Sequence, residues 1–218
     1  ASSAARHSST SKRLAGMSTA FEGSSMRWLA RPMRCASRLA FFKGLQLVTN
    51  RIHASNDTDE IILELSSDLC ALFDAARLTI YTLDEEARTI VTRIKTGLDK
   101  VQSIRLPVSD NSIAGYVAHT GLLVNVGDVY DETELRAISP RLHFQHEVDV
   151  SSGFRSRQML VAPIRDPEGD RIIGVIQLIN TINGEPFSKV AEEGLLGLTQ
   201  TLGVAFARHS EQPARLRS

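Results

Sequence analysis

The spacing of hydrophobic positions along the chain changes at clear boundaries. Apolar residues recur at helical spacing in three segments, which predicts three amphipathic helices. The first covers 39–54. The second begins after a cap at Asn56 or Asp57 and ends at about 72, and the third extends from 186 to about 209. Alternating or continuous apolar runs predict strands over 77–83, 89–95, 104–108, 122–126, 158–164 and 172–180. A short helix over 113–120 follows polar capping residues and ends at a glycine. The pattern therefore predicts an α+β fold whose strands are joined mainly by hairpins.

The strand over 172–180 is apolar on both faces, which is typical of a central strand that is covered on both sides. Gln177 is the exception, on the face that it shares with Val175 and Ile179. A side-chain amide in a covered sheet costs about 1–3 kcal/mol unless it is hydrogen-bonded. Gln177 is therefore either a core glutamine that a neighbouring side chain satisfies or part of the floor of a ligand pocket, and the residues alone leave both readings open.

Two polar segments are candidates for binding. The residues before the helix at 113–120 leave backbone N–H groups and the positive end of a helix dipole facing outward, which is suited to an anion. The segment 128–148 is long, polar and irregular, with a helical turn over 133–138, and we expect it to be a mobile lid. His143 and His146 lie near Glu147 and Asp149, but this spacing is not diagnostic of a metal, and no metal site is predicted.

Charge is unevenly distributed although the formal net charge of the 218 residues is zero. Residues 1–56 are basic, with Glu22 as their one acid, and the remainder is acidic, so no nucleic-acid surface is expected. The serine- and arginine-rich residues 1–38 are expected to be a disordered extension, with a transit peptide or a membrane-surface role around Trp28 as alternatives. Cys35 and Cys70 show no metal or disulfide spacing, and no apolar run approaches the ~20 residues that span a bilayer, so a cytoplasmic protein is expected.

Three blocks carry a family resemblance: residues 104–130 (IRLPVSDNSIAGYVAHTGLLVNVGDVY), 147–164 (EVDVSSGFRSRQMLVAPI) and 172–188 (IIGVIQLINTINGEPFS). In this order they resemble a GAF domain, the small-molecule sensor module of phosphodiesterases, cyclases and bacterial signalling proteins. The likeness is greatest to the cyclic-nucleotide-binding GAF domains of phosphodiesterases. Two further blocks, 78–86 (LTIYTLDEE) and 139–149 (SPRLHFQHEVD), resemble the GAF domains fused to bacterial secretion and pilus-assembly ATPases. It implies a six-stranded antiparallel sheet, with N- and C-terminal helices on one face and a ligand pocket with a lid on the other. The expected organisation is an extension over 1–38, a GAF domain over 39–210 and a tail over 211–218.

The resemblance also implies a set of ligand-binding positions. In the cyclic-nucleotide binders the phosphate rests on backbone amides that match Ile113 and Ala114. An apolar contact at Ile94 takes the place of an aromatic residue that stacks on the base, and Gln177 takes the place of an acid on the last strand. The polar groups that would hold the ribose and the base are Thr79, Asp149, Ser152, Ser156 and Gln177.

Taken together, these features predict a regulatory sensor domain that binds cyclic AMP or cyclic GMP and signals through its terminal helices. We expect a homodimer formed by these helices and an output domain outside this chain, with no cofactor, no metal and no catalytic residue. A ligand-free dimerisation or interaction module of a larger signalling or secretion-ATPase protein is the alternative. An enzyme that reduces methionine sulfoxide would need a cysteine at the pocket, and neither Cys35 nor Cys70 is placed for that role.

Overall fold

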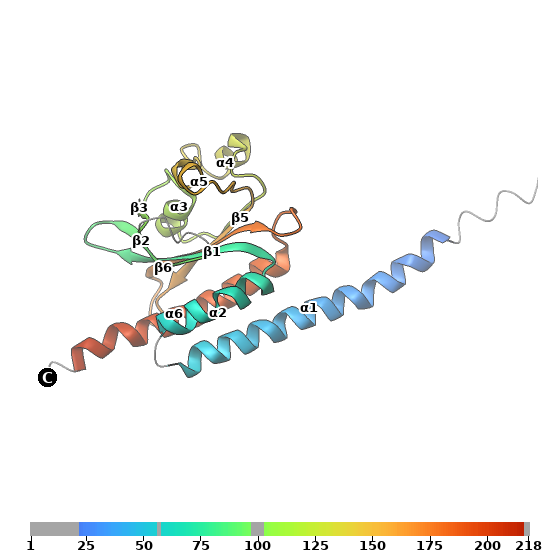
Figure 1. The fold of residues 1–218 in the computed structure, drawn as a ribbon, viewed down its shortest axis with the longest axis horizontal. Helices are drawn as coiled ribbons and strands as arrows, with labels where there is room; N and C mark the ends of the chain where they lie inside the picture. The colour runs from blue at the N-terminus through green and yellow to red at the C-terminus, as the bar shows by residue number, and fades with distance from the viewer. Residues whose placement is uncertain (1–21, 56–57, 97–102, 216–218) are drawn as a thin grey trace, which may run out of the picture. The chain divides into compact units, whose positions relative to one another are not determined.

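The computed structural model describes the backbone of residues 22–55, 58–96 and 103–215, and their side chains except those of 22–36, 58–59, 94 and 209–215 (Figure 1). The chain divides between Phe41 and Phe42, and the compact unit that begins at Phe42 contains the whole sheet.

One antiparallel sheet of six strands forms the centre of the unit, in the order β3-β2-β1-β6-β5-β4. The strands β1 and β6 lie at the middle of the sheet and pair over most of their length. This confirms the central, doubly covered position that the apolar pattern predicted for the last strand. The strands are β1 (Ala75–Asp84), β2 (Thr89–Lys95), β3 (Arg105–Pro107), β4 (Val124–Val126), β5 (Met159–Arg165) and β6 (Ile172–Thr181).

Helices cover both faces of this sheet (Figure 1). The helices α2 and α6 pack on one face, and α3 lies on the other together with α4 and α5. The last turns of α1 join the first layer, where Leu45, Val48 and Ile52 are buried. The helices are α1 (Glu22–Ala54), α2 (Thr58–Leu72), α3 (Ile113–Thr120), α4 (Glu132–Ile138), α5 (Glu147–Ser152) and α6 (Lys189–Arg215).

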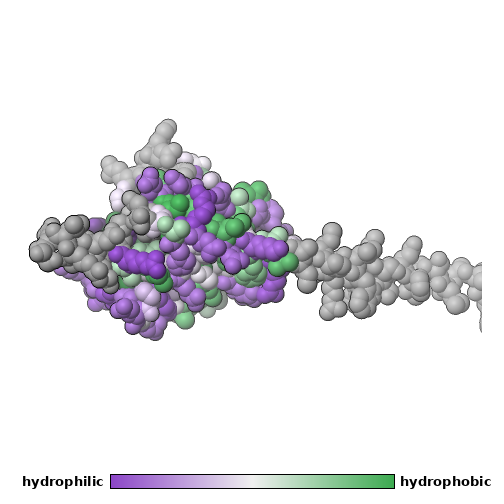
Figure 2. Space-filling view, turned by 90° about the horizontal axis from the view of Figure 1, so that it is seen from below, coloured by the Kyte–Doolittle hydropathy of each residue, from purple (hydrophilic) through white to green (hydrophobic). Residues whose placement is uncertain are grey.

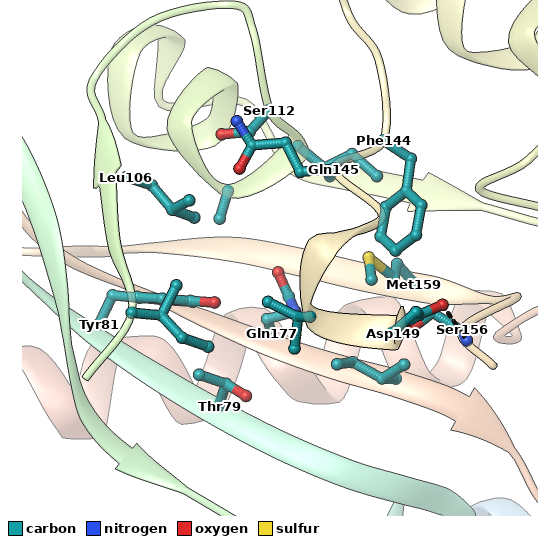
Figure 3. A pocket seen from close by; sticks show the side chains of 15 residues that line it. Thr79, Tyr81, Leu106, Ser112, Phe144, Gln145, Asp149, Ser156, Met159 and Gln177 are labelled. Carbon is teal, nitrogen blue, oxygen red and sulfur yellow. Dashed lines mark hydrogen bonds between the residues drawn. The ribbon is translucent and has the colours of Figure 1, made fainter. Parts of the chain in front are cut away.

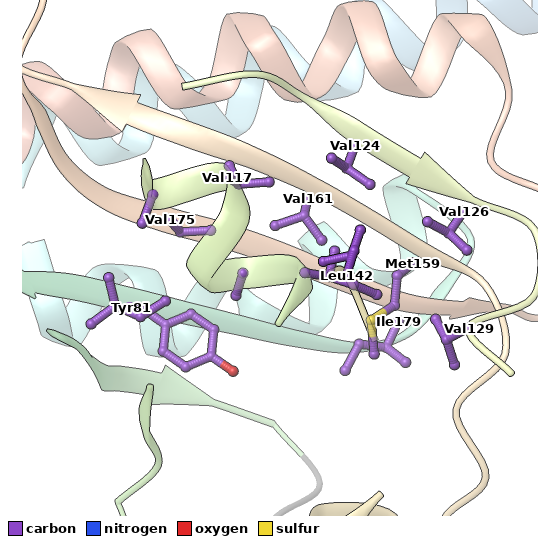
Figure 4. Close-up of a cluster of buried hydrophobic side chains, with 14 of the residues drawn as sticks. Tyr81, Val117, Val124, Val126, Val129, Leu142, Met159, Val161, Val175 and Ile179 are labelled. Carbon is purple, nitrogen blue, oxygen red and sulfur yellow. The ribbon is translucent and has the colours of Figure 1, made fainter. Parts of the chain in front are cut away.

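The alternation of side chains along the central strands separates two cores. Ile176 and Leu178 of β6 are fully buried, as are Leu195, Leu198 and Leu202 of α6, which form the apolar stripe that the sequence predicted. Val175 and Ile179 point to the opposite face, into a cluster that includes Val117, Val161 and Met159 (Figure 4). Gln177 lies between Val175 and Ile179 on that second face.

Two glycines allow the backbones of neighbouring elements to approach closely. A Cβ at Gly174 of β6 would lie 2.5 Å from the carbonyl oxygen of Tyr81, and one at Gly203 of α6 would lie 2.2 Å from the carbonyl oxygen of Arg165. Both neighbours are backbone atoms, which cannot move away as the end of a side chain can. The close packing of α6 on β5 therefore depends on the missing side chain at Gly203.

Several boundaries differ from the predicted ones. The first helix begins at Glu22 and not at residue 39, and residues 24–38 contain several of the strong helix formers Ala, Arg, Met and Leu. The expected division into an extension over 1–38, a domain over 39–210 and a tail over 211–218 stays a prediction. Residues 1–21 and the predicted caps Asn56 and Asp57 lie outside the described residues. The segment predicted as a lid contains α4, where the sequence predicted a helical turn over 133–138, and it is followed by a further helix, α5, that the sequence did not predict.

The surface of the helical layer is mainly hydrophilic, with hydrophobic patches between the charged side chains (Figure 2). Large apolar side chains that remain exposed on its helices are Leu47 of α1, Leu63 of α2 and Leu196 of α6. Within the described residues, no helix combines the length and the apolar character needed to cross a membrane.

We expect Gly203→Ala and Gly197→Ala to change stability in opposite directions, although both lie in α6. The new methyl at Gly203 would collide with the backbone of β5 and lower the free energy of unfolding by about 1–3 kcal/mol. The methyl at Gly197 meets nothing nearer than Leu45 at 4.0 Å, so the higher helix propensity of alanine should raise the free energy of unfolding by roughly 0.5–1 kcal/mol. Chemical denaturation of both variants measures these changes, and equal effects would contradict the close packing described for Gly203.

Candidate ligand-binding site

A cavity of about 70 Å³ lies between the second face of the sheet and the segments that cover it (Figure 3). The strands β1 and β6 form its floor, the start of α3 lies opposite, and the segment from Phe144 to Asp149 closes one side. The polar residues that line it are Thr79, Tyr81, Ser112, Gln145, Asp149, Ser156 and Gln177. The apolar ones are Ile104, Leu106, Ile113, Ala114, Phe144, Val148, Met159 and Ile179.

The floor of the cavity carries polar side chains that the protein itself does not satisfy. Thr79 of β1 pairs directly with Gln177 of β6, so the two side chains lie side by side. Their exposed fractions are 1% and 7%. Neither side chain has a hydrogen-bond partner among the described residues, both line the cavity, and the amide of Gln177 points into it (Figure 3). Of the two readings of Gln177 that the sequence left open, this arrangement favours the pocket floor, because a core glutamine would have a partner.

The start of α3 presents backbone donors opposite the floor. Ser112 caps this helix through its hydroxyl oxygen, which accepts from the N–H of Gly115, and both cap and helix boundaries agree with the sequence prediction. The N–H groups of Ile113 and Ala114 precede the first intrahelical bond and have no acceptor among the described residues. A Cβ at Gly115 would lie 2.4 Å from the carbonyl oxygen of Pro107, so glycine lets the helix start close to β3. These two donors are therefore available to a ligand.

The carboxylate of Asp149, at the opposite end of the cavity, is already fully engaged. One oxygen accepts from the hydroxyl of Ser156 at 2.7 Å, and the other accepts from the backbone N–H of Ser156 at 2.7 Å and from the hydroxyl of Tyr130 at 2.9 Å. Asp149 is 8% exposed, and these bonds join α5 to the loop before β5 and to the start of the lid segment. Asp149 thus holds the wall of the cavity together.

Aromatic and cationic side chains surround the Asp149 contact. The ring of Tyr130 stacks on His146 and lies 5.2 Å from the ring centre of Phe144, while the guanidinium of Arg155 lies 3.3 Å from the centre of the Tyr130 ring. Desolvation, with a smaller contribution from the negative charge of Asp149, raises the pKa of Tyr130, so its hydroxyl remains protonated and donates to the carboxylate. The covering segment is therefore held by stacking and hydrogen bonds together.

The position of Ser156 depends on Asn180 at the end of β6. Asn180 has a left-handed backbone (φ 53°), a conformation that asparagine tolerates better than most residues. Its side chain donates to the carbonyl oxygen of Arg155 at 2.8 Å and accepts from the N–H of Arg157 at 2.6 Å, so it brackets Ser156. These two hydrogen bonds of Asn180 hold the loop that carries Ser156 against the end of β6, and Ser156 in turn bonds to Asp149.

The structure brings most of the predicted ligand-binding residues together. Thr79, Ile113, Ala114, Asp149, Ser156 and Gln177 line one cavity. Ser152 does not: its hydroxyl lies at the end of α5 and accepts from the N–H of Phe154. This is a correction that follows from the helix the sequence did not predict. The side chain of Ile94 lies outside the described residues, although the backbone of Ile94 pairs with Ile80 in the sheet.

Sequence reasoning missed Tyr81, Tyr130 and the covering residues Phe144 and Gln145. Tyr81 shares a strand face with Thr79 in the alternating pattern of β1, so the same periodicity that pointed to Thr79 could have identified it. No local signal could have found Phe144 and Gln145, because they reach the cavity only through the path of the lid segment. Within the described residues, no group of three or more His, Cys, Asp or Glu side chains is placed to hold a metal ion.

The cavity lining carries few charged side chains. Among the residues that the structure describes, it includes no lysine, arginine or histidine, and its one acid, Asp149, is already hydrogen-bonded. The other polar groups of the lining are neutral and include the hydroxyls of Thr79 and Tyr81, the amides of Gln177 and Gln145, and the backbone N–H groups at the start of α3. A site of this kind can orient a small polar ligand by hydrogen bonds, and it can offset a negative charge only through N–H groups and the helix dipole.

The family model described as the GAF domain matches residues 57–206, more than half of the chain. The chain belongs to the GAF domain family. The matched region begins just before α2 and ends within α6, so it contains the sheet, the cavity and both helical layers apart from α1. The six-stranded antiparallel sheet with helices on its faces is the fold that the sequence resemblance implied.

Among characterised relatives, this GAF domain is similar to parts of cyclic-nucleotide phosphodiesterases. It is 38% identical over 92 residues to the dual 3′,5′-cyclic-AMP and -GMP phosphodiesterase 11 of Drosophila melanogaster, covering 42% of this chain and 6% of the relative. It is 28% identical over 165 residues to phosphodiesterase 11A of Takifugu rubripes, covering 70% and 17%. The chain thus spans less than a fifth of the length of these enzymes.

Solved GAF domains share the fold at low sequence identity. The GAF domain of a phosphoenolpyruvate-protein phosphotransferase from Coxiella burnetii superposes with a TM-score of 0.67 at 17% identity, over 81% of this chain and 98% of that one. Free methionine-R-sulfoxide reductase from Neisseria meningitidis, solved with its substrate, gives a TM-score of 0.61 at 18% identity, over 78% and 90%. At this identity the likeness concerns the fold.

We expect Ser156→Ala to lower the free energy of unfolding by about 1–3 kcal/mol, because a buried carboxylate oxygen of Asp149 would lose its hydroxyl donor. Ser151→Ala is the matched control: Ser151 lies on the exposed side of α5, where its hydroxyl donates only to Val148, and the change should stay within roughly 0.5 kcal/mol. Urea denaturation followed by circular dichroism compares the two. Equal stability of both variants would show that Asp149 does not fasten the cavity wall.

Proposed function

We propose that this GAF domain is a regulatory sensor that binds a cyclic nucleotide, cyclic AMP or cyclic GMP, in the cavity between β1, β6 and α3. The observation that carries the proposal is the pair formed by Thr79 and Gln177, two buried polar side chains without partners that lie opposite the free N–H groups of Ile113 and Ala114. The similarity to parts of cyclic-nucleotide phosphodiesterases supports the choice of ligand.

The floor pair suits the edge of a nucleobase. An unpaired amide in a buried site costs about 1–3 kcal/mol of stability. Position 177 nevertheless carries a glutamine, although a methionine or leucine would fill the same space without that cost. The amide of Gln177 offers both a donor and an acceptor, and the hydroxyl of Thr79 can take either role. A purine presents donors and acceptors side by side along one edge. A bound base would therefore form hydrogen bonds with both Thr79 and Gln177 and offset the destabilisation that their unpaired groups cause.

The opposite side of the cavity suits a single negative charge. A cyclic phosphate carries one charge, and the N–H groups of Ile113 and Ala114 lie at the positive end of α3. The lining supplies no cationic side chain that would favour a more highly charged phosphate. The arrangement therefore fits a cyclic monophosphate better than a nucleoside di- or triphosphate.

Entry of a nucleotide requires the covering segment to move. The cavity volume of about 70 Å³ is room for a few water molecules, whereas sites for small organic ligands typically measure about 300–1,000 Å³. Phe144, Gln145 and Val148 line the cavity from the segment between α4 and α5, so displacement of this segment enlarges it. Binding is then coupled to the conformation of the cover, which is what a sensor requires.

An enzymatic role like that of the methionine sulfoxide reductases has less support. The cavity lining contains no cysteine. Cys70 lies in α2, on the other side of the sheet, where burial raises the pKa of its thiol and so disfavours the reactive thiolate. The lining hydroxyl that does bond to a carboxylate, that of Ser156, belongs to the hydrogen-bond network of Asp149 that holds the cavity wall.

We expect Gln177→Met to abolish nucleotide binding without lowering the stability of the ligand-free protein, because it removes an unpaired amide and keeps the packing volume. Gln158→Met is the matched control, at the residue just before the neighbouring strand β5. Gln158 is equally buried, but its amide donates to the carbonyl oxygen of Gly184 at 2.7 Å and does not line the cavity. This change should cost about 1–3 kcal/mol of stability and leave the affinity unchanged.

Isothermal titration with cyclic AMP and cyclic GMP measures the affinities, and thermal melting with and without each nucleotide measures the stabilisation that a ligand produces by mass action. Absence of heat and of any shift in melting temperature with both nucleotides in the wild-type protein would overturn the proposal. An interaction module without a ligand would then be the better description of this domain.

A further inference from the structure

A third buried polar group faces the cavity, and the ligand positions implied by the family resemblance do not include it. Tyr81 lies on β1 two residues after Thr79, so both side chains point to the same face of the sheet. It is 3% exposed. Its ring lies at the end of the cavity near Leu106, and its hydroxyl points along the floor towards Gln177 (Figure 3).

The hydroxyl of Tyr81 has no hydrogen-bond partner among the residues that the structure describes. Buried tyrosine hydroxyls usually have one, and an unpaired buried hydroxyl costs about 1–3 kcal/mol. Phenylalanine would fill the same apolar space beside Leu106 and Ile90 without that cost. Packing therefore explains the ring of Tyr81 but not its hydroxyl.

The other tyrosines of the chain differ from Tyr81 in burial or in hydrogen bonding. The hydroxyl of Tyr130 donates to Asp149, and Tyr116 lies on α3 with its ring only partly buried. Tyr81 alone combines nearly complete burial with an unpaired hydroxyl that faces open space. Burial also raises its pKa well above the ordinary value, so the phenol is neutral and keeps its proton to donate.

No charged group of the lining can take this proton in the present arrangement. The one carboxylate, Asp149, lies at the opposite end of the cavity and already accepts three hydrogen bonds. Neither Thr79 nor Gln177 on the floor, nor Gln145 in the covering segment, makes a hydrogen bond to Tyr81. The acceptor must therefore come from what enters the cavity.

We propose that Tyr81 is a ligand-contacting residue that donates a hydrogen bond to an acceptor on the heterocycle of the bound nucleotide, a carbonyl oxygen or a ring nitrogen. This inference rests on the proposed function, and it adds Tyr81 to the floor pair of Thr79 and Gln177. The base then lies along β1 and β6, with its apolar face covered by Leu106 and its polar edge directed at three neutral groups.

The test is Tyr81→Phe, which removes one oxygen atom and keeps the ring. Affinities for cyclic AMP and cyclic GMP are measured by isothermal titration for the wild type, for Tyr81→Phe and for Tyr116→Phe as the matched control outside the cavity. We expect Tyr81→Phe to weaken binding of the tighter nucleotide by about five- to thirtyfold, the loss typical of one buried hydrogen bond. Tyr116→Phe should stay within about twofold of the wild type.

Melting of the ligand-free proteins supplies the second measurement. Because the hydroxyl of Tyr81 has no partner, Tyr81→Phe should melt at or above the temperature of the wild type. A lower melting temperature would show that the hydroxyl is held within the protein, and it would overturn the inference.

Unchanged nucleotide affinity of Tyr81→Phe beside a binding wild type would also overturn the inference, while the proposed function would stand. If the wild type binds neither nucleotide, the proposed function fails, and the role of Tyr81 fails with it. The wild-type titration thus separates the two failures.

Discussion

The antiparallel pairing of β1 with β6 is the constraint on which both the core and the cavity depend. Its register sets Thr79 opposite Gln177 and directs both away from the helical layer of α2 and α6. Gly174 allows the two backbones to approach at the far end of the same pairing. Because successive side chains alternate between faces, a shift of one residue would move Gln177 into the apolar core and Ile176 into the cavity. The apolar residues that fix the register therefore also place the polar floor.

The polar groups around the cavity fall into two kinds. Asp149, Ser156 and Tyr130 satisfy one another, and Asn180 brackets the loop that carries Ser156. Such a completed network stabilises the wall and leaves little capacity for a ligand. Thr79, Tyr81 and Gln177 are buried on the floor without partners, a state that costs stability until something binds. The side chains of the wall therefore stabilise the structure, whereas those of the floor are available to recognise a ligand. This differs from the role in ribose and base binding that the resemblance implied for Asp149, which lies in the wall.

Elements with strong local signals could be predicted from the sequence. The boundaries of β2 and of α3 agree with the pattern, because a turn precedes the strand and a serine cap and a glycine delimit the helix. The helix α5 could not be predicted in the same way. Its six residues, EVDVSS, are rich in valine and serine, which favour other conformations, and the contacts of Asp149 with Ser156 and Tyr130 hold it in place. Ser152 was assigned to the site because that helix was not foreseen.

The sequence by itself determined that the chain forms an α+β domain whose central, apolar strand carries one polar side chain, Gln177. The three sequence blocks that resemble GAF domains pointed to the family. Periodicity and capping are local, so they can be read without coordinates. Only the tertiary structure decided which polar groups are satisfied, because hydrogen-bond partners such as Asp149 and Tyr130 are separated along the chain and meet through packing. For the same reason, the unpaired hydroxyl of Tyr81 became visible only when the sheet, α3 and the covering segment were seen together.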